Sequence, residues 1–157
     1  MDATVYPGAY FDGAAQHGTC ACGVFIIIEE GQVYDIHLNG GVGTNNEAEV
    51  MALAGLLSIC DFLGLKKLHI FGDSKVIIEH VLSKHTIRNI HTSGWLNKVE
   101  AIWRITKDYT IFHITRDKNQ RADALSKQGL SSPQGIWRMK ITVNNISQIQ
   151  DFSIPGT

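Results

Sequence analysis

The order of hydrophobic and polar positions predicts strands at the start of the chain and an alternation of helices and strands after them. Three apolar runs, rich in β-branched and aromatic residues, cover residues 5–15, 20–28 and 33–38. Residues 29–32, between the last two runs, carry a glycine and two acidic side chains, which is typical of a hairpin turn. We therefore expect three successive strands here.

The pattern then changes to a helical period. Apolar residues recur at intervals of three and four over residues 47–63, after a loop at 39–46 that is rich in glycine and asparagine. Asn45 or Asn46 is expected to cap this helix, and Gly64 to end it. The later pattern predicts a strand over 67–72, a helix over 74–83, a polar connector over 85–93, a helix over 95–106, a strand over 110–115 and a helix over 119–128 that is capped by Asn119.

The resulting order, βββ-α-β-α-α-β-α, predicts an α/β fold with a five-stranded mixed sheet flanked by helices. We expect residues 1–130 to form one domain. Ser131, Ser132 and Pro133 resemble a linker, because serine and proline in series favour loops. Residues 131–157 are interpreted as a C-terminal tail that either adds a strand over 137–143 or stays mobile.

Composition and charge narrow the function classes only a little. Hydrophobic residues make up 44% of the 157 residues, no apolar run is long enough for a membrane span, and we expect no signal peptide. The three cysteines are interpreted as reduced thiols of an intracellular protein. A net charge of −1 does not indicate a nucleic-acid partner. If four carboxylates held cations, however, 14 basic residues would face only 11 acidic ones, and weak binding to a polyanion would be compatible with the total.

Two carboxylates stand out because their surroundings are apolar. Asp12 interrupts the first predicted strand, where a buried charge is costly unless it is paired or binds a cation, and Gly13 beside it leaves room for a close approach. Glu49 lies on a helical face that is otherwise apolar, whereas Glu47 points outward. The residues that share this face are Leu53, Leu56, Cys60 and Leu63. The alternatives are that Asp12 bonds its own turn and that Glu49 favours the helix dipole.

Two further acids lie at the ends of predicted elements. Asp73 follows the strand over 67–72 at its carboxyl end, where ligand sites of open α/β sheets usually lie. Its alternative role is to cap the next helix, a role that Ser74 could also take. Asp123 lies in the first turns of the last helix, and its alternative is a solvated side chain.

The four acids are more informative together than singly. Carboxylates from different elements that meet at one sheet edge are the ligands that magnesium favours. Two such ions can hold the attacking water and the leaving oxygen of a phosphodiester cleavage. The sequence has no nucleophile motif of a Ser–His–Asp site and no phosphate-binding loop, since residues 40–43 match one only weakly.

At this point the chain resembles the type 1 ribonuclease H family, in particular the domain found in the reverse transcriptases of retroelements (LTR retrotransposons and retrovirus-like elements) and in plant homologues. The resemblance covers about residues 5–130, in family order and with family-like spacing. The matching segments are Phe11-Asp12-Gly13-Ala14, Thr44-Asn45-Asn46-Glu47-Ala48-Glu49, Phe71-Gly72-Asp73-Ser74 and residues 116–127, which read RDKNQRADALSK.

The resemblance implies a ribonuclease H-like fold and an endoribonuclease that cuts the RNA strand of RNA–DNA hybrids, leaving 5′-phosphate and 3′-hydroxyl ends. It implies two Mg²⁺ ions, for which Mn²⁺ substitutes. The implied catalytic, metal-binding residues are Asp12, Glu49, Asp73 and Asp123. The residues expected to contact the hybrid are Gly13, Thr44, Asn45, Asn46, Ser74 and Arg116. For Asn45 and Asn46 the alternative is helix capping alone.

The sequence departs from the family pattern in three places. Many members carry a histidine before the last helix, where residues 116–118 have none, and Arg116 is the candidate substitute. Residues 84–91 leave no room for the basic helix that some members insert. We also expect no separate hybrid-binding domain of the kind that other members carry. We therefore expect weak, salt-sensitive binding of the hybrid by the isolated chain.

The expected partners are an RNA–DNA hybrid and, if the chain is part of a polyprotein, a linked polymerase domain; no membrane partner is expected. The expected location is intracellular, in the cytoplasm or nucleus, or in a virus-like particle if a retroelement encodes the chain. Two alternatives remain open at this stage. One is a catalytically silent module that binds hybrid or packs on a polymerase, and the other is a nuclease or transposase of the same fold that acts on DNA.

Overall fold

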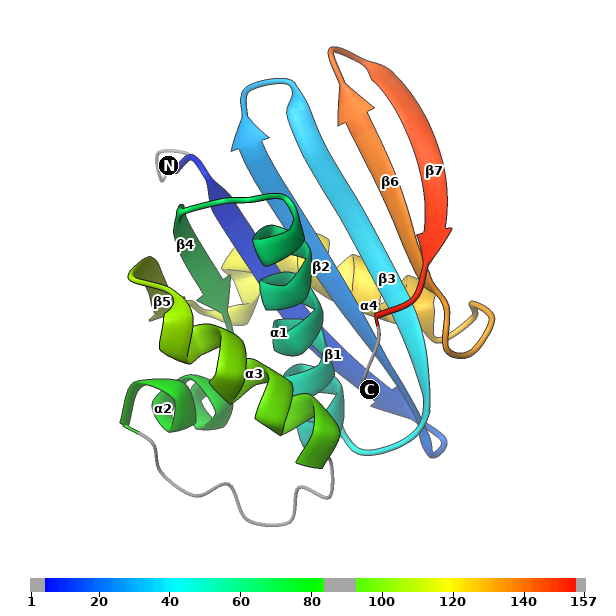
Figure 1. The fold of residues 1–157 in the computed structure, drawn as a ribbon. Helices are drawn as coiled ribbons and strands as arrows, with labels where there is room; N and C mark the ends of the chain where they lie inside the picture. The colour runs from blue at the N-terminus through cyan, green and yellow to red at the C-terminus, as the bar shows by residue number, and fades with distance from the viewer. Residues whose placement is uncertain (1–4, 84–92, 155–157) are drawn as a thin grey trace.

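A computed structural model describes residues 5–83 and 93–154 of the chain, and its centre is one mixed sheet of seven strands (Figure 1). The sheet has the order β5-β4-β1-β2-β3-β6-β7. Its strands are β1 (Gly8–Gln16), β2 (Thr19–Glu29), β3 (Gln32–Val42), β4 (Lys67–Gly72), β5 (Asp108–His113), β6 (Trp137–Val143) and β7 (Ile146–Phe152). The helices are α1 (Asn45–Phe62), α2 (Lys75–Ser83), α3 (Ser93–Ile105) and α4 (Gln120–Gly129), with a short 3₁₀ helix η1 (Arg116–Lys118) before α4.

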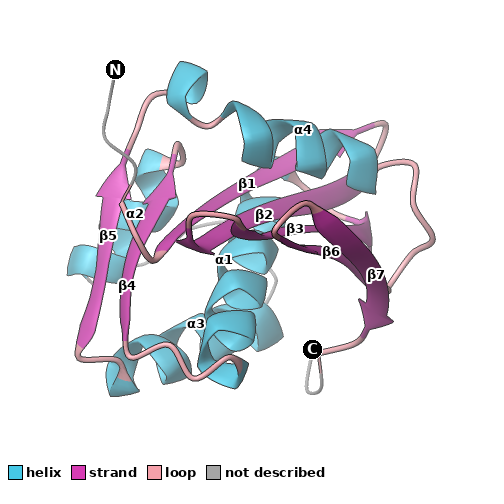
Figure 2. Cartoon of the chain, turned by 90° about the horizontal axis from the view of Figure 1, so that it is seen from above, coloured by secondary structure: helices cyan, strands magenta, loops and turns pink. Residues whose placement is uncertain are grey.

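The strands pair in both directions, and the helices cover both faces of the sheet. β1, β2 and β3 form an antiparallel meander, while β4 pairs with β1 and β5 with β4 in parallel. Helices α1 and α3 lie on one face, and α4 crosses β1, β2 and β3 on the other (Figure 2). The predicted mixed sheet with flanking helices is confirmed. The predicted number of five strands is wrong, because two more strands follow α4.

The two additional strands form a hairpin on the edge of β3. β6 pairs antiparallel with β3, and β7 pairs antiparallel with β6. Asn144 and Asn145 connect them with φ angles of 49° and 69°, the left-handed values that a tight two-residue hairpin turn requires. Trp137 anchors the hairpin: it is 2% exposed and contacts α1 at Gly55, where a Cβ atom would collide with the indole ring. We predicted only the strand over 137–143, because the residues of β7 are mostly exposed and lack an apolar pattern.

The start of α1 differs from the prediction. β3 continues to Val42, into the predicted loop at 39–46. The N-cap of α1 is Thr44, whose hydroxyl oxygen accepts a hydrogen bond from the backbone N–H of Glu47 at 3.2 Å. Asn45 and Asn46 lie in the first turn and do not cap the helix. The expected lack of a basic helix at 84–91 falls on residues outside the described part of the chain.

The last helix has a different anchor from the predicted cap. Asn119 occupies the N-cap position of α4 but makes no capping hydrogen bond. Its side-chain amide instead donates to the backbone carbonyl oxygen of Phe11 at 2.9 Å, and the residue is 1% exposed. This bond fixes the start of α4 to the middle of β1. In the part of the chain that the structure describes, no helix is long and apolar enough to cross a bilayer.

Candidate active site

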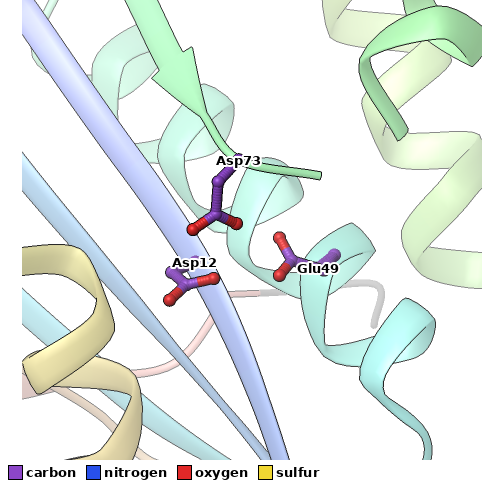
Figure 3. Close-up of side chains that lie close together, drawn as sticks. All are labelled: Asp12, Glu49 and Asp73. Atoms are coloured by element: carbon purple, nitrogen blue, oxygen red, sulfur yellow. The ribbon is translucent and has the colours of Figure 1, made fainter. Parts of the chain in front are cut away.

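Three carboxylates from three different elements point toward one another at one edge of the sheet (Figure 3). Asp12 belongs to β1, Glu49 to the first turns of α1, and Asp73 follows the last residue of β4. One oxygen from each lies within 4.8 Å of the other two. The parallel pairing of β1 with β4 brings the two aspartates together, since Phe11 is the partner of Gly72 in the register. Glu49 is 8% exposed and occupies the core side of α1, as the helical pattern predicted, whereas Glu47 is more exposed.

Gly13 holds α1 against β1 at this point. Its backbone N–H donates to Asp12 Oδ1 at 2.9 Å and to Glu49 Oε1 at 3.0 Å, so one donor orients two carboxylates. A Cβ atom on Gly13 would lie 2.5 Å from the backbone nitrogen of Glu49 and 2.6 Å from the carbonyl carbon of Ala48. We expected the missing side chain to leave room for a close approach. In the structure α1 makes such an approach, because glycine has no Cβ to prevent it.

The cluster is electrostatically unfavourable without a cation. Burial raises the pKa of Asp12 from 3.8 to about 7; the hydrogen bond with Glu49 opposes this rise, and the charges of Asp73 and Asp123 add to it. Burial also raises the pKa of Glu49 well above its ordinary value, and the neighbouring Asp12 raises it further. Like charges that are buried together favour protonation unless a positive charge compensates them.

Two oxygens of the cluster lack the partners that buried polar atoms normally have. Oε2 of Glu49 and Oδ2 of Asp73 are buried and make no hydrogen bond. Each such atom costs free energy unless water or a ligand reaches it. Clustered carboxylate oxygens with unused acceptor capacity are the ligands that hard divalent cations take. The residues therefore fit a divalent metal ion.

Asp123 lies beside this group but outside it. The sequence predicted one set of four acids, and the structure brings Asp12, Glu49 and Asp73 together with Asp123 at the margin. Asp123 Oδ2 forms an ion pair with Lys127 Nζ at 3.0 Å, one helical turn further along α4. The aspartate is 30% exposed and the lysine 67% exposed, so this pair is open to solvent.

The four acids line a common hollow of about 420 Å³ between β1, the start of α1, the end of β4 and α4. Of the residues expected to contact a substrate, the hollow is lined by Gly13, Asn45, Asn46, Ser74 and Arg116. Thr44 is absent from its lining and caps α1 instead. Lys127 lines the hollow and was missed by sequence reasoning, although its spacing of four residues from Asp123 was a usable signal.

Known proteins match the part of the chain that contains the four acids. The sequence model of a family described as reverse transcriptase-like matches residues 10–129. A curated protein named Ribonuclease HI, from Halobacterium salinarum, is 28% identical over 127 residues, which are 78% of this chain. This chain spans 63% of the length of that relative.

Solved structures agree with the fold. The crystal structure of RNase H1 from the halophilic archaeon Halobacterium salinarum matches with a TM-score of 0.71 and 26% identity, over 80% of this chain and 98% of that one. LC11-RNase H1 in complex with an RNA/DNA hybrid matches with a TM-score of 0.68 and 25% identity, over 78% of this chain and 95% of that one.

Proposed function

The chain belongs to the reverse transcriptase-like family, and we propose that it is a ribonuclease H, an endoribonuclease that hydrolyses the RNA strand of RNA–DNA hybrids. The observation that carries this proposal is the cluster of Asp12, Glu49 and Asp73 with two buried, unpartnered carboxylate oxygens. The relatives named Ribonuclease HI and RNase H1, one of them solved with an RNA/DNA hybrid, support the substrate.

We propose that Asp12, Glu49, Asp73 and Asp123 hold two Mg²⁺ ions, with Mn²⁺ as a substitute. When bound, such ions activate a water for attack and stabilise the leaving 3′ oxygen of an in-line cleavage, which gives 5′-phosphate and 3′-hydroxyl ends. The chain supplies the geometry, because the Gly13 N–H fixes one oxygen each of Asp12 and Glu49, while Oε2 of Glu49 has no hydrogen-bond partner. In the metal-free protein, Lys127 neutralises Asp123 through their ion pair.

The remaining polar groups of the hollow are suited to a sugar-phosphate backbone. Asn45 and Asn46 form the first turn of α1, whose N-terminal N–H groups and dipole favour an anion. Ser74 and Arg116 also line the hollow. We propose that these four residues contact the hybrid. We also propose that Arg116 takes the place of the histidine that many family members carry before the last helix. We expected Thr44 to contact the hybrid as well. Because its side chain caps α1, we now assign this contact to Asn45 and Asn46.

The charge balance predicts how firmly the hybrid is held. The chain has a net charge of −1, so few cations are available for phosphates. We therefore propose weak binding that weakens further as the salt concentration rises. A covalently linked polymerase domain, if there is one, would raise the local substrate concentration. We also propose that residues 1–130 form the catalytic domain, to which the hairpin is an addition, and that the protein acts inside cells, where hybrids arise.

The test is cleavage of a labelled RNA strand with Mg²⁺ in four substrates: RNA–DNA hybrid, duplex RNA, single-stranded RNA and duplex DNA. Asp73→Asn removes an acid of the cluster, and Asp61→Asn removes an exposed acid near the other end of α1 as a matched control. The proposal is supported if the protein cuts only the hybrid, and if this activity is lost in Asp73→Asn and in EDTA but kept in Asp61→Asn. Hybrid binding without cutting at any Mg²⁺ or Mn²⁺ level overturns it in favour of a silent binding module, and cutting of duplex DNA favours a DNA nuclease.

A further inference from the structure

Four aromatic side chains form a continuous row across four neighbouring strands. Tyr10 is the register partner of Phe25 on one side and of Phe71 on the other, and Phe71 is the partner of Phe112. Their ring centroids are 5.9, 4.9 and 5.5 Å apart in this order, and the ring planes differ by 32° or less. We call Phe25, Tyr10, Phe71 and Phe112 the aromatic row. Cross-strand aromatic pairs stabilise a sheet, but a row of four is longer than that role requires.

The aromatic row lies on the α4 side of the sheet and extends beyond that helix. α4 packs on β1, β2 and β3, and within residues 5–83 and 93–154 no helix covers β4 and β5 on this side (Figure 2). Phe112, on the edge strand β5, is 45% exposed. Beside it, His69 Nδ1 is 3.1 Å from Thr110 Oγ1, so polar groups border the aromatic surface. The open end of the row is therefore a flat aromatic surface in contact with solvent.

The other end of the row is closed by a cation. The guanidinium carbon of Arg121 lies 4.1 Å from the centroid of the Phe25 ring, and its nitrogens donate to both carboxylate oxygens of Asp35 at 2.7 and 2.8 Å. Tyr10 and Phe25 also form part of a hollow of about 230 Å³ that is lined by Lys118 and Arg121. That volume is below the usual range for drug-sized ligands and suits a fragment as small as one base.

The row is continuous with the candidate active site along two strands. Because side chains alternate along a strand, the next residue after Tyr10 on the same face of β1 is Asp12. Phe71 likewise precedes Asp73 by two positions at the end of β4. Two residues of a β-strand span about 7 Å, which is close to twice the spacing of about 3.4 Å between successive stacked bases. A nucleic-acid strand that leaves the active site toward β4 and β5 would therefore pass directly onto the aromatic row.

We propose that the aromatic row binds unpaired nucleotides of a nucleic-acid strand that extends from the hybrid held at the active site. This inference rests on the proposed function for the hybrid, and it adds a second, single-stranded element to the substrate. Stacking on aromatic side chains is the general means of binding single strands without sequence preference, because every base has a flat face. Lys118, which lines the hollow beside Tyr10 and Phe25, suits a phosphate of such a strand, and this charge favours a nucleic acid over a neutral protein segment.

The test compares hybrids with and without a single-stranded extension. Binding is measured by fluorescence anisotropy with the Asp73→Asn protein, so that the substrate stays intact. The probes are a blunt hybrid and the same hybrid with an unpaired extension on each of its four strand ends in turn. Phe112→Ala removes the exposed ring of the row, and Phe62→Ala, which removes an 88% exposed ring on α1, is the matched control.

We expect at least one extension to tighten binding by roughly 5-fold or more, since each stacked base contributes on that order. Phe112→Ala should remove the gain and leave the affinity for blunt hybrid unchanged, while Phe62→Ala should keep the gain. A halogenated pyrimidine in the extension should photo-crosslink to residues of β4 or β5. Equal affinity for blunt and extended hybrids, a gain that survives Phe112→Ala, or a crosslink elsewhere would each overturn the inference.

The two proposals fail separately. Cleavage of the blunt hybrid by the unsubstituted protein tests the proposed function and does not involve the row. If the blunt hybrid is cut but no extension tightens binding, only the stacking surface is refuted. If extensions bind through Phe112 but no hybrid is cut, the proposed nuclease is refuted and the single-strand surface remains.

Discussion

Asp12→Asn should abolish metal-dependent activity and at the same time stabilise the metal-free protein at alkaline pH. In the folded protein the pKa of Asp12 is raised from 3.8 to about 7, with burial as the largest cause. In the unfolded chain the group loses its proton near its ordinary pKa. Between these two values the folded state binds more protons than the unfolded state, so the free energy of unfolding falls as pH rises. The contribution of protonated Asp12 to the free energy of unfolding is fully present below about pH 4 and lost above about pH 7.

The size of the effect follows from the same two values. At 1.36 kcal/mol per pKa unit, the shift from 3.8 to about 7 corresponds to about 4 kcal/mol, as an upper bound because Asp12 and Glu49 share the proton. Asparagine imitates the neutral form at every pH and keeps an oxygen that accepts from the Gly13 N–H. In Asp12→Asn the pH-dependent loss should therefore be smaller than in the unsubstituted protein, since of these two acids only Glu49 still contributes a raised pKa.

The assay is urea unfolding in EDTA, followed by tryptophan fluorescence, at about pH 5 and about pH 8.5. The unsubstituted protein should lose stability between these two pH values, and Asp12→Asn should be the more stable of the two at the higher pH. Added Mg²⁺ should restore stability to the unsubstituted protein alone, because a ligand that binds only the folded state stabilises it. A flat pH profile of the unsubstituted protein, or an asparagine variant that is less stable at both pH values, would refute this reasoning.

Four further substitutions test single contacts. Gly13→Ala should lower both activity and the melting temperature, at a cost of about 1–3 kcal/mol, because its Cβ would meet the carbonyl carbon of Ala48 at 2.6 Å; unchanged melting would contradict the close approach of α1. Trp137→Ala should cost about 3–5 kcal/mol in chemical denaturation, since the ring is 2% exposed, and a loss below about 1 kcal/mol would show that the hairpin is not anchored there. Thr44→Ala should destabilise the protein by about 1 kcal/mol through loss of the N-cap, whereas Asn45→Ala should leave stability unchanged and weaken hybrid binding, so the reverse pattern would assign the cap to the asparagine.

The parts of the site that lie on single elements could be predicted from the sequence. Glu49 was identified because one acid on an apolar helical face must point to the core, and α1 is buried along most of its length. Asp12 was identified because a charge inside an apolar strand is costly unless it is paired or binds a cation, and Asp73 because it follows a strand at its carboxyl end, where ligand sites usually lie. The family assignment is confirmed by the match over residues 10–129. The metal-binding and substrate-binding roles of these residues stay predictions.

The parts that depend on pairing between distant segments could not be predicted. Thr44, Asn45 and Asn46 all have capping side chains, and the choice among them depends on where β3 ends. β7 is a strand because β6 offers hydrogen bonds to it, not because of its own pattern, which is exposed on both faces. The aromatic row requires the register of four strands drawn from residues 10 to 112, and no local pattern in the sequence contains that register.

The β6–β7 hairpin also determines which edge of the sheet meets other molecules. Without it, the free edge would be β3, an eleven-residue strand with the buried side chains of Tyr34, Ile36 and Leu38. A long apolar edge of this kind pairs readily with the edges of other chains and leads to aggregation. With the hairpin in place, the free edge on this side is the shorter β7, which carries Gln148 and Asp151. A chain that stopped at residue 130 would keep every proposed catalytic acid, yet we expect it to self-associate through β3.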